Sequence, residues 1–499
     1  MGEAQKWMFE PSFNRAIKVR GGDDRLTSDA GVLLQREADH ELGLTESLAA
    51  RMHDPRDPDK IRYTFVELLR ERIYAFGQGY SAQDDLDRLA HDPALRMSVW
   101  DRCGDTVIDE RLASQPTQSR LIETLASHKS NREELRGALA DWSARHLRAS
   151  GGDHAARRVT LDIDSFPVVM HGRQAGAKYN GYYRETMYHP LLASFSVNGD
   201  YDAFQDGGRL GNGFVHAILR AGNVHTAQGA LRFIRTAVSR AALLGYVIDV
   251  RLDAGFTSGK IMDGLTDDGQ RFIGRLKTNA VLDRLAQPHL KRPVGRPPAE
   301  GYQSLAELGS YRAEGWRHAQ RLILVIIDEP DAKTGQLNLL PDYFFLVTNR
   351  TEEELPAEPG LEHYRKRGTF EDRLGEFNAT VLPRLSSPGF AENEATLLLA
   401  LLAFNLTSML RCELEDDAGA CLDLRRFQRQ VLQAGARITK HSRRLCVDLA
   451  KAVSESWERL IKRIAGWRLP NRWPAPLGAG MRAWVAPPPH AFLEEVLQL

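Results

Sequence analysis

The spacing of apolar residues changes near residue 158, and this change limits the possible folds more than any other feature of the sequence. Before it, apolar side chains recur at helical intervals, for example along Tyr63–Phe76. In Arg158–Asp164 (RVTLDID), Val, Leu and Ile instead alternate with Thr and Asp. Alternation with a period of two residues is typical of a strand that buries one face. The sequence therefore predicts an α/β fold.

The elements predicted after this strand follow the order of a ribonuclease-H-like core. Further strands are predicted at His189–Val197 and Gly213–Arg220, then an amphipathic helix at Ala227–Leu244 and a fourth strand at Val247–Asp253. The pattern alone predicts an α/β domain. The ribonuclease-H-like topology is the hypothesis that this order favours.

A β-rich insertion and two helical flanks surround the predicted core. Strands are predicted at Arg271–Leu276, Arg321–Ile327 and Tyr343–Val347, and helical spacing returns after Leu361 with a fully apolar helix near Leu397–Phe404. The predicted division is a helical N-terminal DNA-binding region at 1–150, a catalytic core at 151–270 and 351–410, the β-rich insertion at 271–350, and a basic helical C-terminal region at 411–499.

The composition is that of an ordinary globular protein. The chain has 499 residues, enough for about three domains of roughly 150 residues each, and an apolar fraction of 42% excludes disordered and collagen-like classes. Four widely spaced cysteines without a CxxC pair exclude a zinc ribbon and a disulfide scaffold. The N-terminus lacks a secretory h-region, and no apolar run approaches the roughly 18 residues of a membrane span. We therefore expect a cytoplasmic protein with no membrane partner.

Charge is distributed unevenly along a neutral chain. Lys plus Arg and Asp plus Glu each number 66, yet residues 421–475 hold thirteen basic residues against four acidic ones. Predicted C-terminal helices bearing Arg425 and Arg429 could follow DNA phosphates, with a solvated basic surface as the alternative. The segment Ser114–Arg120 (SQPTQSR) is compatible with a DNA-reading helix-turn-helix, but a polar helix start in a bundle is the favoured interpretation.

Two aspartates end predicted strands of the core. Asp164 ends the first strand and Asp253 ends the fourth. Carboxylates at the carboxyl ends of strands project into the crevice where α/β sheets bind ligands. Asp162 shares the strand face of Asp164 and is an alternative ligand.

A predicted helix supplies a third acid. In His363–Asn378 (HYRKRGTFEDRLGEFN), Tyr364, Arg367 and Glu371 fall at i, i+3 and i+7, which places them on one stripe. Together they offer an aromatic donor, a guanidinium for phosphate and a carboxylate for metal. The polar face of an ordinary amphipathic helix is the alternative interpretation.

These residues carry a resemblance to a known family. Tyr-x2-Arg-x3-Glu after two strand-end aspartates resembles the DDE transposases of bacterial insertion sequences, in the group whose signature is Tyr-x2-Arg-x3-Glu-x6-Lys. The segments LDIDSF around Asp164, HGRQAGAKYNGYY at 171–183, YHPLL at 188–192 and RLDAGF around Asp253 support it. The resemblance implies a cut-and-paste transposase that binds terminal inverted repeats, cuts the ends through a hairpin intermediate and joins them to target DNA.

The resemblance also implies roles for individual residues. Asp164, Asp253 and Glu371 would form the catalytic triad and hold two Mg²⁺ ions, with Mn²⁺ as a possible substitute. Tyr364 and Arg367 would hold phosphates of double-stranded DNA, and a homodimer is expected in the synaptic complex. The Lys of the signature is Asn378 here, so one phosphate contact lacks its charge.

Two smaller features also bear on DNA. The segment Lys291–Pro298 (KRPVGRPP) resembles an AT-hook, in which Arg292 and Arg296 would enter an A·T-rich minor groove, with an exposed Pro-rich loop as the alternative. Trp316 is a candidate stacking platform for a flipped base, because relatives use a Trp in that region, and a core Trp is the alternative.

Three function classes remain open at this stage. The first is a DNA transposase in the bacterial cytoplasm, associated with the nucleoid when bound to DNA. The second is a transposase-derived DNA-binding protein without catalysis, which the change at Asn378 supports. The third is a ribonuclease-H-fold nuclease, which would not require the Tyr and Arg beside Glu371.

Overall fold

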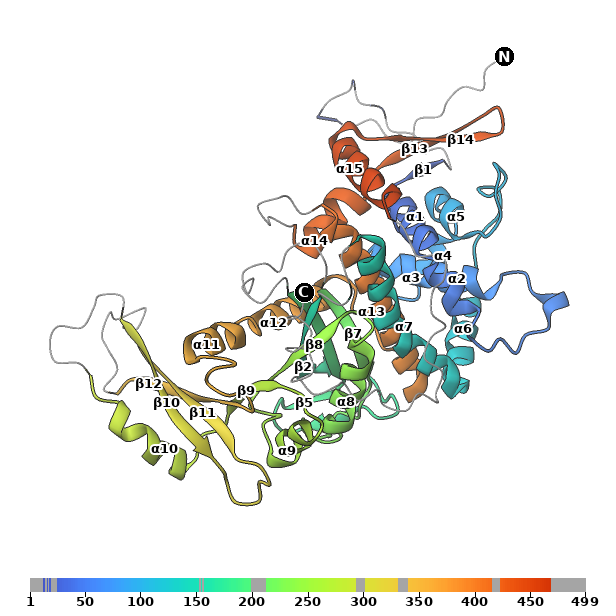
Figure 1. Cartoon of the computed structure of the whole chain (residues 1–499). Coiled ribbons are helices and arrows are strands. Elements are labelled where there is room, and N and C mark those ends of the chain that lie inside the picture. The colour runs from blue at the N-terminus through green and yellow to red at the C-terminus, as the bar shows by residue number, and fades with distance from the viewer. Residues whose placement is uncertain are drawn as a thin grey trace, which may run out of the picture.

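The computed structural model describes residues 25–151, 157–198, 212–292, 301–330, 340–414 and 422–467, together with Ser12, Phe13, Ala16, Lys18 and His154. A large twisted sheet occupies the centre, a β-rich arm extends from one side of it, and a helical body lies on the other (Figure 1). The predicted minor-groove reader Arg296 lies outside the described residues.

Eight strands of the described chain form the central sheet, in the order β10-β11-β12-β9-β8-β2-β6-β7. Strands β2, β8 and β9 are parallel, whereas β6 runs antiparallel to β2, and β7 runs antiparallel to β6 and so in the direction of β2. Its core half comprises β2 (Arg158–Ser165), β6 (Leu191–Asn198), β7 (Asn212–Ile218), β8 (Tyr246–Leu252) and β9 (Phe272–Leu276). This order and these directions are those of the ribonuclease-H-like core expected from the sequence.

The two faces of β2 are buried against different partners. Val159, Leu161 and Ile163 are fully buried in an apolar cluster that includes α8 (Ala230–Ala241) and α9 (Gly259–Asp267). The opposite face carries Asp162, which is also fully buried. Burial of a carboxylate requires an ionic or hydrogen-bonding partner, so the polar half of the alternating pattern is also structural.

The insertion continues the central sheet. Its elements are α10 (Ala280–Ala286), β10 (Tyr302–Tyr311), β11 (Gln320–Asp328) and β12 (Asp342–Thr348). Strands at the positions of β9, β11 and β12 were predicted, but β10 was not. A β-bulge between Glu307 and Gly309, where Gly309 has φ of 70°, shifts the register of β10 and interrupts its alternation.

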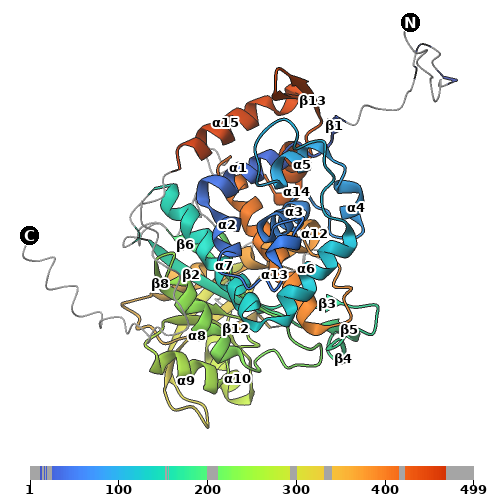
Figure 2. The ribbon, with the colours of Figure 1, turned by 90° about the vertical axis from the view of Figure 1, so that its right-hand side faces the viewer.

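Helices from both ends of the chain form a single helical body. Figures 1 and 2 show the N-terminal helices beside α15 and the hairpin β13–β14, and one apolar cluster runs from Ala30 to Trp467. The body comprises β1 (Leu26–Thr27), α1 (Val32–Leu42), α2 (Leu44–Ala49), α3 (Phe65–Gly77), α4 (Asp85–Leu89), α5 (Pro93–Val99), α6 (Gln115–Ser127), α7 (Lys129–Ala149), α13 (Phe390–Cys412), α14 (Leu424–Phe427), β13 (Ala436–His441), β14 (Arg444–Leu449) and α15 (Ser454–Ala465).

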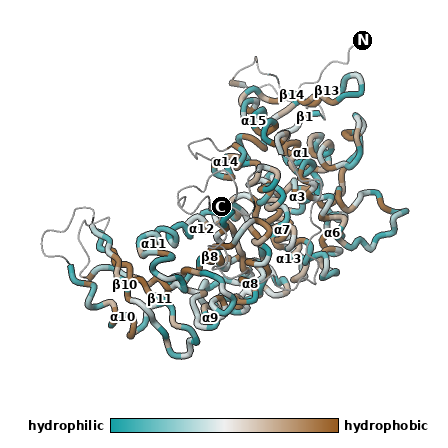
Figure 3. The backbone as a smooth tube through the Cα atoms, viewed as in Figure 1, coloured by the Kyte–Doolittle hydropathy of each residue, from teal (hydrophilic) through white to brown (hydrophobic). Residues whose placement is uncertain are grey.

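Helix α13 lies at the centre of this body. It contains the apolar run predicted to be buried, and it packs against α3, α6, α7 and β7. Its length and composition would allow it to cross a membrane, but its apolar window is entirely buried inside the protein. Hydrophobic residues follow the central strands and α13, while hydrophilic ones lie outside (Figure 3). A helix buried on all sides has no need of an amphipathic pattern.

One prediction about the flanks is wrong. Residues 436–449, expected to be helical, form the hairpin β13–β14, whose turn residues Ser442 and Arg443 have φ of 50° and 63°. Asn and Gly are the usual residues in such a turn, so the sequence carries no hairpin signal. The structure confirms the favoured interpretation of Ser114–Arg120 and not the helix-turn-helix, because the chain before Ser114 is irregular back to α5. The Ser114–Arg120 segment is the start of a helix packed in a bundle.

A buried acid in the helical body makes stability depend on pH. Glu71 of α3 accepts a hydrogen bond from Gln118 Nε2 at 2.8 Å, and burial raises its pKa to about 8. The folded state therefore holds this proton more tightly than the unfolded state, whose carboxyl has a pKa near 4.5. Stability from this group is fully present below pH 4.5 and is lost as pH rises through about 8.

The substitution Glu71→Gln should remove this pH dependence. The amide keeps a hydrogen-bond acceptor for Gln118 but cannot ionise, so we expect a Tm above that of the wild type at pH 9, by at least about 2 °C. At pH 5 the two proteins should melt together. Thermal unfolding monitored by circular dichroism at both pH values tests this, and an equal difference at both pH values would contradict it.

Candidate functional site

Two strand-end aspartates meet at one edge of the central sheet. Asp164 is the penultimate residue of β2, and Asp253 follows the last residue of β8. The two strands are parallel neighbours in which Ile163 is aligned with Leu252, so the next residue of each strand emerges at the same edge. The negative charge of Asp253 contributes to raising the pKa of Asp164, as expected for carboxylates that face one another.

The helix that carries the third acid is divided in two. The expected continuous helix is α11 (Ala357–Arg365) followed by α12 (Gly368–Thr380). At the junction, the amide of Arg367 bonds to the carbonyl of Tyr364, three residues back, at 2.9 Å. Gly368 follows, a residue with low helix propensity. Despite the break, Arg367 and Glu371 still contact each other.

Buried polar contacts dock α11 onto β8. His363 Nε2 lies 3.2 Å from a carboxylate oxygen of Asp249, and Arg251 donates a hydrogen bond to the carbonyl oxygen of His363 at 3.0 Å. Each of these three side chains is at most 3% exposed. Tyr364 follows His363 directly. These contacts therefore fix the position of Tyr364 relative to the end of β8.

A second buried arginine docks α12 onto the neighbouring strand. Arg373 donates to Ser194 Oγ at 2.7 Å and to the carbonyl oxygen of Phe195 at 3.2 Å, both on β6. Burial lowers its pKa to about 10. Arg373 and Glu371 are two residues apart, so one helical turn presents one side chain to the sheet and the other to solvent. Glu371 is 68% exposed.

Asp162 belongs to the structural set of charges. Both of its oxygens accept hydrogen bonds from Arg251, at 2.7 and 2.6 Å, and its side chain is 0% exposed. A carboxylate satisfied by a bidentate arginine inside the sheet is not available to a ligand. The alternative that Asp162 is the ligand in place of Asp164 is therefore not supported by the geometry.

Arg367 joins two of the three candidate acids. Its guanidinium donates to Asp164 Oδ2 at 2.5 Å and to Glu371 Oε1 at 3.1 Å, and its side chain is 7% exposed. Burial raises the pKa of Asp164, and Arg367 opposes that shift. Asp253 also interacts electrostatically with Arg367. One guanidinium thus faces three carboxylates, which leaves these four groups with net negative charge.

This charge balance bears on metal binding. Among the described residues, no group of three or more His, Cys, Asp or Glu side chains is arranged to hold a metal ion. The donor chemistry nevertheless fits a divalent cation, because Asp164, Asp253 and Glu371 supply the hard oxygen atoms that Mg²⁺ and Mn²⁺ prefer. Arg367 supplies only one positive charge to them. The residues therefore fit the ion by chemistry and charge.

The remaining predicted residues lie in several places. Tyr364 is next to the acids: burial raises its pKa to about 12, and the charges of Asp253 and Glu371 add to that rise. Arg425 and Arg429 are exposed, as expected for a DNA contact, on α14 and the π-helical turn after it. Arg292 is engaged with Asp328 at 2.7 Å.

Trp316 lies in the turn between β10 and β11, where it is partly buried. Its ring packs edge-to-face on Tyr311, with centroids 5.6 Å apart. It also lies so close to Gly259 of α9 that a Cβ there would be 2.5 Å from the ring. These contacts give Trp316 a packing role, and its role in base stacking stays a prediction.

Sequence reasoning missed two groups of residues near the acids. The docking set of Asp249, Arg251 and His363 could not be recognised, because its partners are far apart in sequence. Tyr182 and Tyr183 stand within the segment HGRQAGAKYNGYY. Burial raises the pKa of Tyr183, and the charges of Asp164 and Asp253 add to that rise. Adjacent tyrosines in a polar, Gly-containing segment were the available signal.

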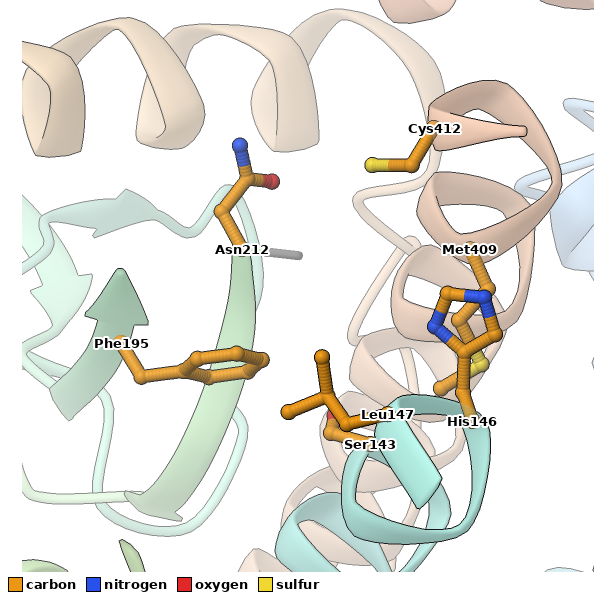
Figure 4. Close-up of a pocket in the computed structure, with 7 residues that line it drawn as sticks. All are labelled: Ser143, His146, Leu147, Phe195, Asn212, Met409 and Cys412. Carbon is orange, nitrogen blue, oxygen red and sulfur yellow. The ribbon is translucent and has the colours of Figure 1, made fainter. Parts of the chain in front are cut away.

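The pocket in Figure 4 is a separate feature. It has a volume of about 10 Å³ and lies between the sheet, α7 and α13, with Phe195 and Asn212 on its sheet side. Phe195 is paired with Leu161, three residues along β2 from Asp164. His146 in its wall is engaged with Glu413 at 2.9 Å. The pocket is small and mostly apolar, and it contains none of the three candidate acids.

The chain is similar to known proteins over most of its length. A family model described as "Transposase DDE domain group 1" matches residues 9–466. A solved structure of a piggyBac transposase synaptic complex with hairpin DNA is similar to the chain, at 12% sequence identity and a TM-score of 0.39, covering 90% of this chain and 87% of that chain. No curated protein sequence matches. The family match extends over the helical flanks as well as the core.

Substitution of the two acids on β2 should separate their roles. Asp162→Asn leaves the buried Arg251 guanidinium without its counter-charge, so we expect the free energy of unfolding to fall by about 3 kcal/mol. Asp164→Asn should change it by less than about 1 kcal/mol, because Arg367 keeps Glu371 as an ionic partner. Urea unfolding of both variants at pH 7 measures this, and equal losses would mean that Asp164 is also structural.

Proposed function

The chain belongs to the transposase DDE domain group 1 family, and from this membership we propose that it is a DNA transposase of an insertion sequence. It binds the terminal inverted repeats of its element, cuts the DNA there and joins the ends to target DNA. The observation that carries this proposal is the convergence of Asp164, Asp253 and Glu371 around Arg367, with Tyr364 beside them.

Asp164, Asp253 and Glu371 would hold two Mg²⁺ ions, or Mn²⁺ in their place. When bound, such ions activate a water or a 3′-hydroxyl and stabilise the leaving oxygen of an in-line phosphoryl transfer. The protein's own acids supply the negative charge that attracts them, and β2, β8 and α12 hold those acids at the sheet edge. No covalent protein intermediate is part of this mechanism.

Arg367 and Tyr364 would position the DNA backbone. A guanidinium binds a phosphate in the same bidentate manner as a carboxylate. Arg367 therefore pairs with Asp164 and Glu371 when DNA is absent and has a phosphate as an alternative partner when DNA is bound. The raised pKa of Tyr364 keeps its phenol protonated, so that it can donate a hydrogen bond to phosphate.

The exposed basic residues on the C-terminal side would extend this contact. Helix α14 lies next to α12, where the amide of Leu424 donates to Glu376 at 3.0 Å. Arg425 lies on α14 and Arg429 on the π-helical turn Gln428–Leu432 that follows, and both side chains are exposed to solvent. Single π-helical turns occur frequently at functional sites.

We also propose that the protein acts as a homodimer on paired DNA ends. It works in the bacterial cytoplasm and is associated with the nucleoid when it is bound to DNA.

Cleavage of an end substrate tests the proposal directly. A labelled duplex carrying the inverted repeat that flanks the gene is incubated with protein and Mg²⁺, with and without a target plasmid. Cutting at the repeat end and joining to the plasmid supports a transposase. Cutting without joining under any condition would favour a nuclease, and binding without cutting would favour a DNA-binding protein without catalysis.

Glu371→Gln should abolish cleavage while leaving end binding within about twofold of the wild type. The substitution removes one carboxylate from the metal-binding set, and Glu371 is exposed enough that folding does not depend on it. Asp372→Asn, at the adjacent exposed position, is the matched control and should cut normally. Cleavage assays and electrophoretic mobility shifts measure the two activities, and equal loss of both would mean that Glu371 is structural.

Asn378→Lys should strengthen binding to the transposon end. Asn378 is exposed on α12, two turns after Glu371, where the family signature has Lys. One added phosphate contact releases about one counterion, so the slope of log K against log salt should steepen by roughly 0.9. Binding titrations between 50 and 200 mM salt measure this slope. An unchanged slope would show that no phosphate passes this position.

A further inference from the structure

A small hairpin beside the candidate acids displays tyrosines to solvent. It comprises β4 (Lys178–Asn180) and β5 (Glu185–Tyr188), joined by residues 181–184. Of the five exposed aromatic side chains among the described residues, three are in this hairpin: Tyr182 is 87% exposed, Tyr179 is 61% and Tyr183 is 39%. Three exposed aromatic rings within five residues mark a surface for binding rather than packing.

The turn that carries these rings is rigid. The side-chain oxygen of Asn180 accepts hydrogen bonds from the amides of Tyr182 and Tyr183, at 3.0 and 3.3 Å. Its amide nitrogen donates to the carbonyl oxygen of Gly222 at 2.7 Å, which ties the turn to a second loop. Gly222 lies so close to Met187 that an added Cβ would be 2.0 Å from its carbonyl oxygen. Preorganised aromatic rings lose little conformational entropy when they bind.

The hairpin is held against the edge where the acids emerge. Only His189 and Pro190 separate β5 from β6, and β6 pairs with β2 so that Leu192 is aligned with Asp164. The ring of Tyr183 packs edge-to-face on the buried ring of His189, with centroids 5.7 Å apart. Tyr182 packs in the same way on Tyr183, at 5.0 Å. A chain of ring contacts therefore extends from the sheet edge to the exposed Tyr182.

We propose that Tyr182 and Tyr183 form a stacking platform for a nucleobase that leaves the DNA helix beside the cleaved phosphate. The inference rests on the proposed function, because the phosphodiester bound at Asp164 and Asp253 would bring its own bases to the hairpin. Aromatic side chains stack on any unpaired base without a need for a particular sequence. Trp316, the candidate for this role in the sequence analysis, is packed against Tyr311 and Gly259.

The neighbouring residues favour a nucleic acid over a protein partner. The residues around the two tyrosines, Gly181, Arg184 and Glu185, are also exposed. The rings of Tyr182 and Tyr183 are therefore surrounded by polar surface and are not part of an extended apolar patch. Arg184 has a left-handed backbone, with φ of 59°, and its amide donates to the carbonyl oxygen of Asn180 at 2.8 Å. This closes the turn and leaves the faces of the aromatic rings as its main apolar surface.

Photocrosslinking tests the platform independently of cleavage. A 5-iodouracil base is placed at each position within three nucleotides of the cleavage site, in one series in the transposon end and in another in the target duplex. After irradiation of the full-length protein on this DNA, peptide mass spectrometry locates the crosslink. We expect a crosslink at Tyr182 or Tyr183, and the series that yields it identifies which DNA supplies the base.

Variants measure what the contact contributes. Tyr182→Ala should lower the cleavage rate of a fully paired end about 10-fold, and a substrate with a mismatch at the crosslinked position should recover most of that loss. Tyr182→Phe keeps the ring and should cut as the wild type does. Tyr246→Ala is the matched control, because Tyr246 is 57% exposed at the other end of β8, and it should change neither cleavage nor crosslinking.

The outcomes distinguish failure of the platform from failure of the proposed function. Cutting by the wild type with no crosslink in the hairpin overturns the platform alone. A hairpin crosslink without cutting supports the platform and contradicts the transposase proposal. A change from dimer to monomer in Tyr182→Ala, with no crosslink in the wild type, would assign the tyrosines to a subunit interface and overturn the inference.

Discussion

The ion pair between Asp162 and Arg251 is the interaction on which the candidate site depends. It joins the two central strands inside the sheet, and the same guanidinium holds the carbonyl of His363 at the end of α11. Breaking such a pair would leave an unpaired charge in the interior. The segments β2, β8 and α11 must therefore keep one relative position. Those three segments place Asp164, Asp253 and Tyr364. The geometry at the sheet edge is thus fixed by charges that never reach the solvent.

At the edge of the sheet, by contrast, the negative charges outnumber the positive ones. Asp164, Asp253 and Glu371 converge on one guanidinium, that of Arg367, so the site lacks positive charge until something else provides it. The interior charges satisfy one another, whereas those at the edge do not. A surplus of like charge destabilises a folded protein locally and is kept where a ligand compensates for it. This contrast separates the structural acids from the candidate catalytic ones.

The sequence predicts the core well because its strands have local patterns, and it fails where long-range contacts decide. The alternation in β2 and β8 identified both strands and their terminal acids. Asp162 and Asp164 occupy the same strand face with the same chemistry, and only Arg251, 87 residues beyond Asp164, tells them apart. Strand β10 was missed because a bulge breaks its period, and the β13–β14 hairpin because Ser442 and Arg443 occupy a turn that usually contains Asn and Gly.

The central position of α13 has a consequence for how the protein is made. Helices α1 to α7 end at Ala149, but the helix around which they pack begins at Phe390, after 240 intervening residues. At about 5–20 residues per second, a ribosome needs roughly 12–48 s to synthesise the intervening chain. For that time the apolar faces of the N-terminal helices lack their main partner. These faces are therefore accessible to chaperones during synthesis, and the core strands, which are contiguous in sequence, can fold before the helical body that precedes them.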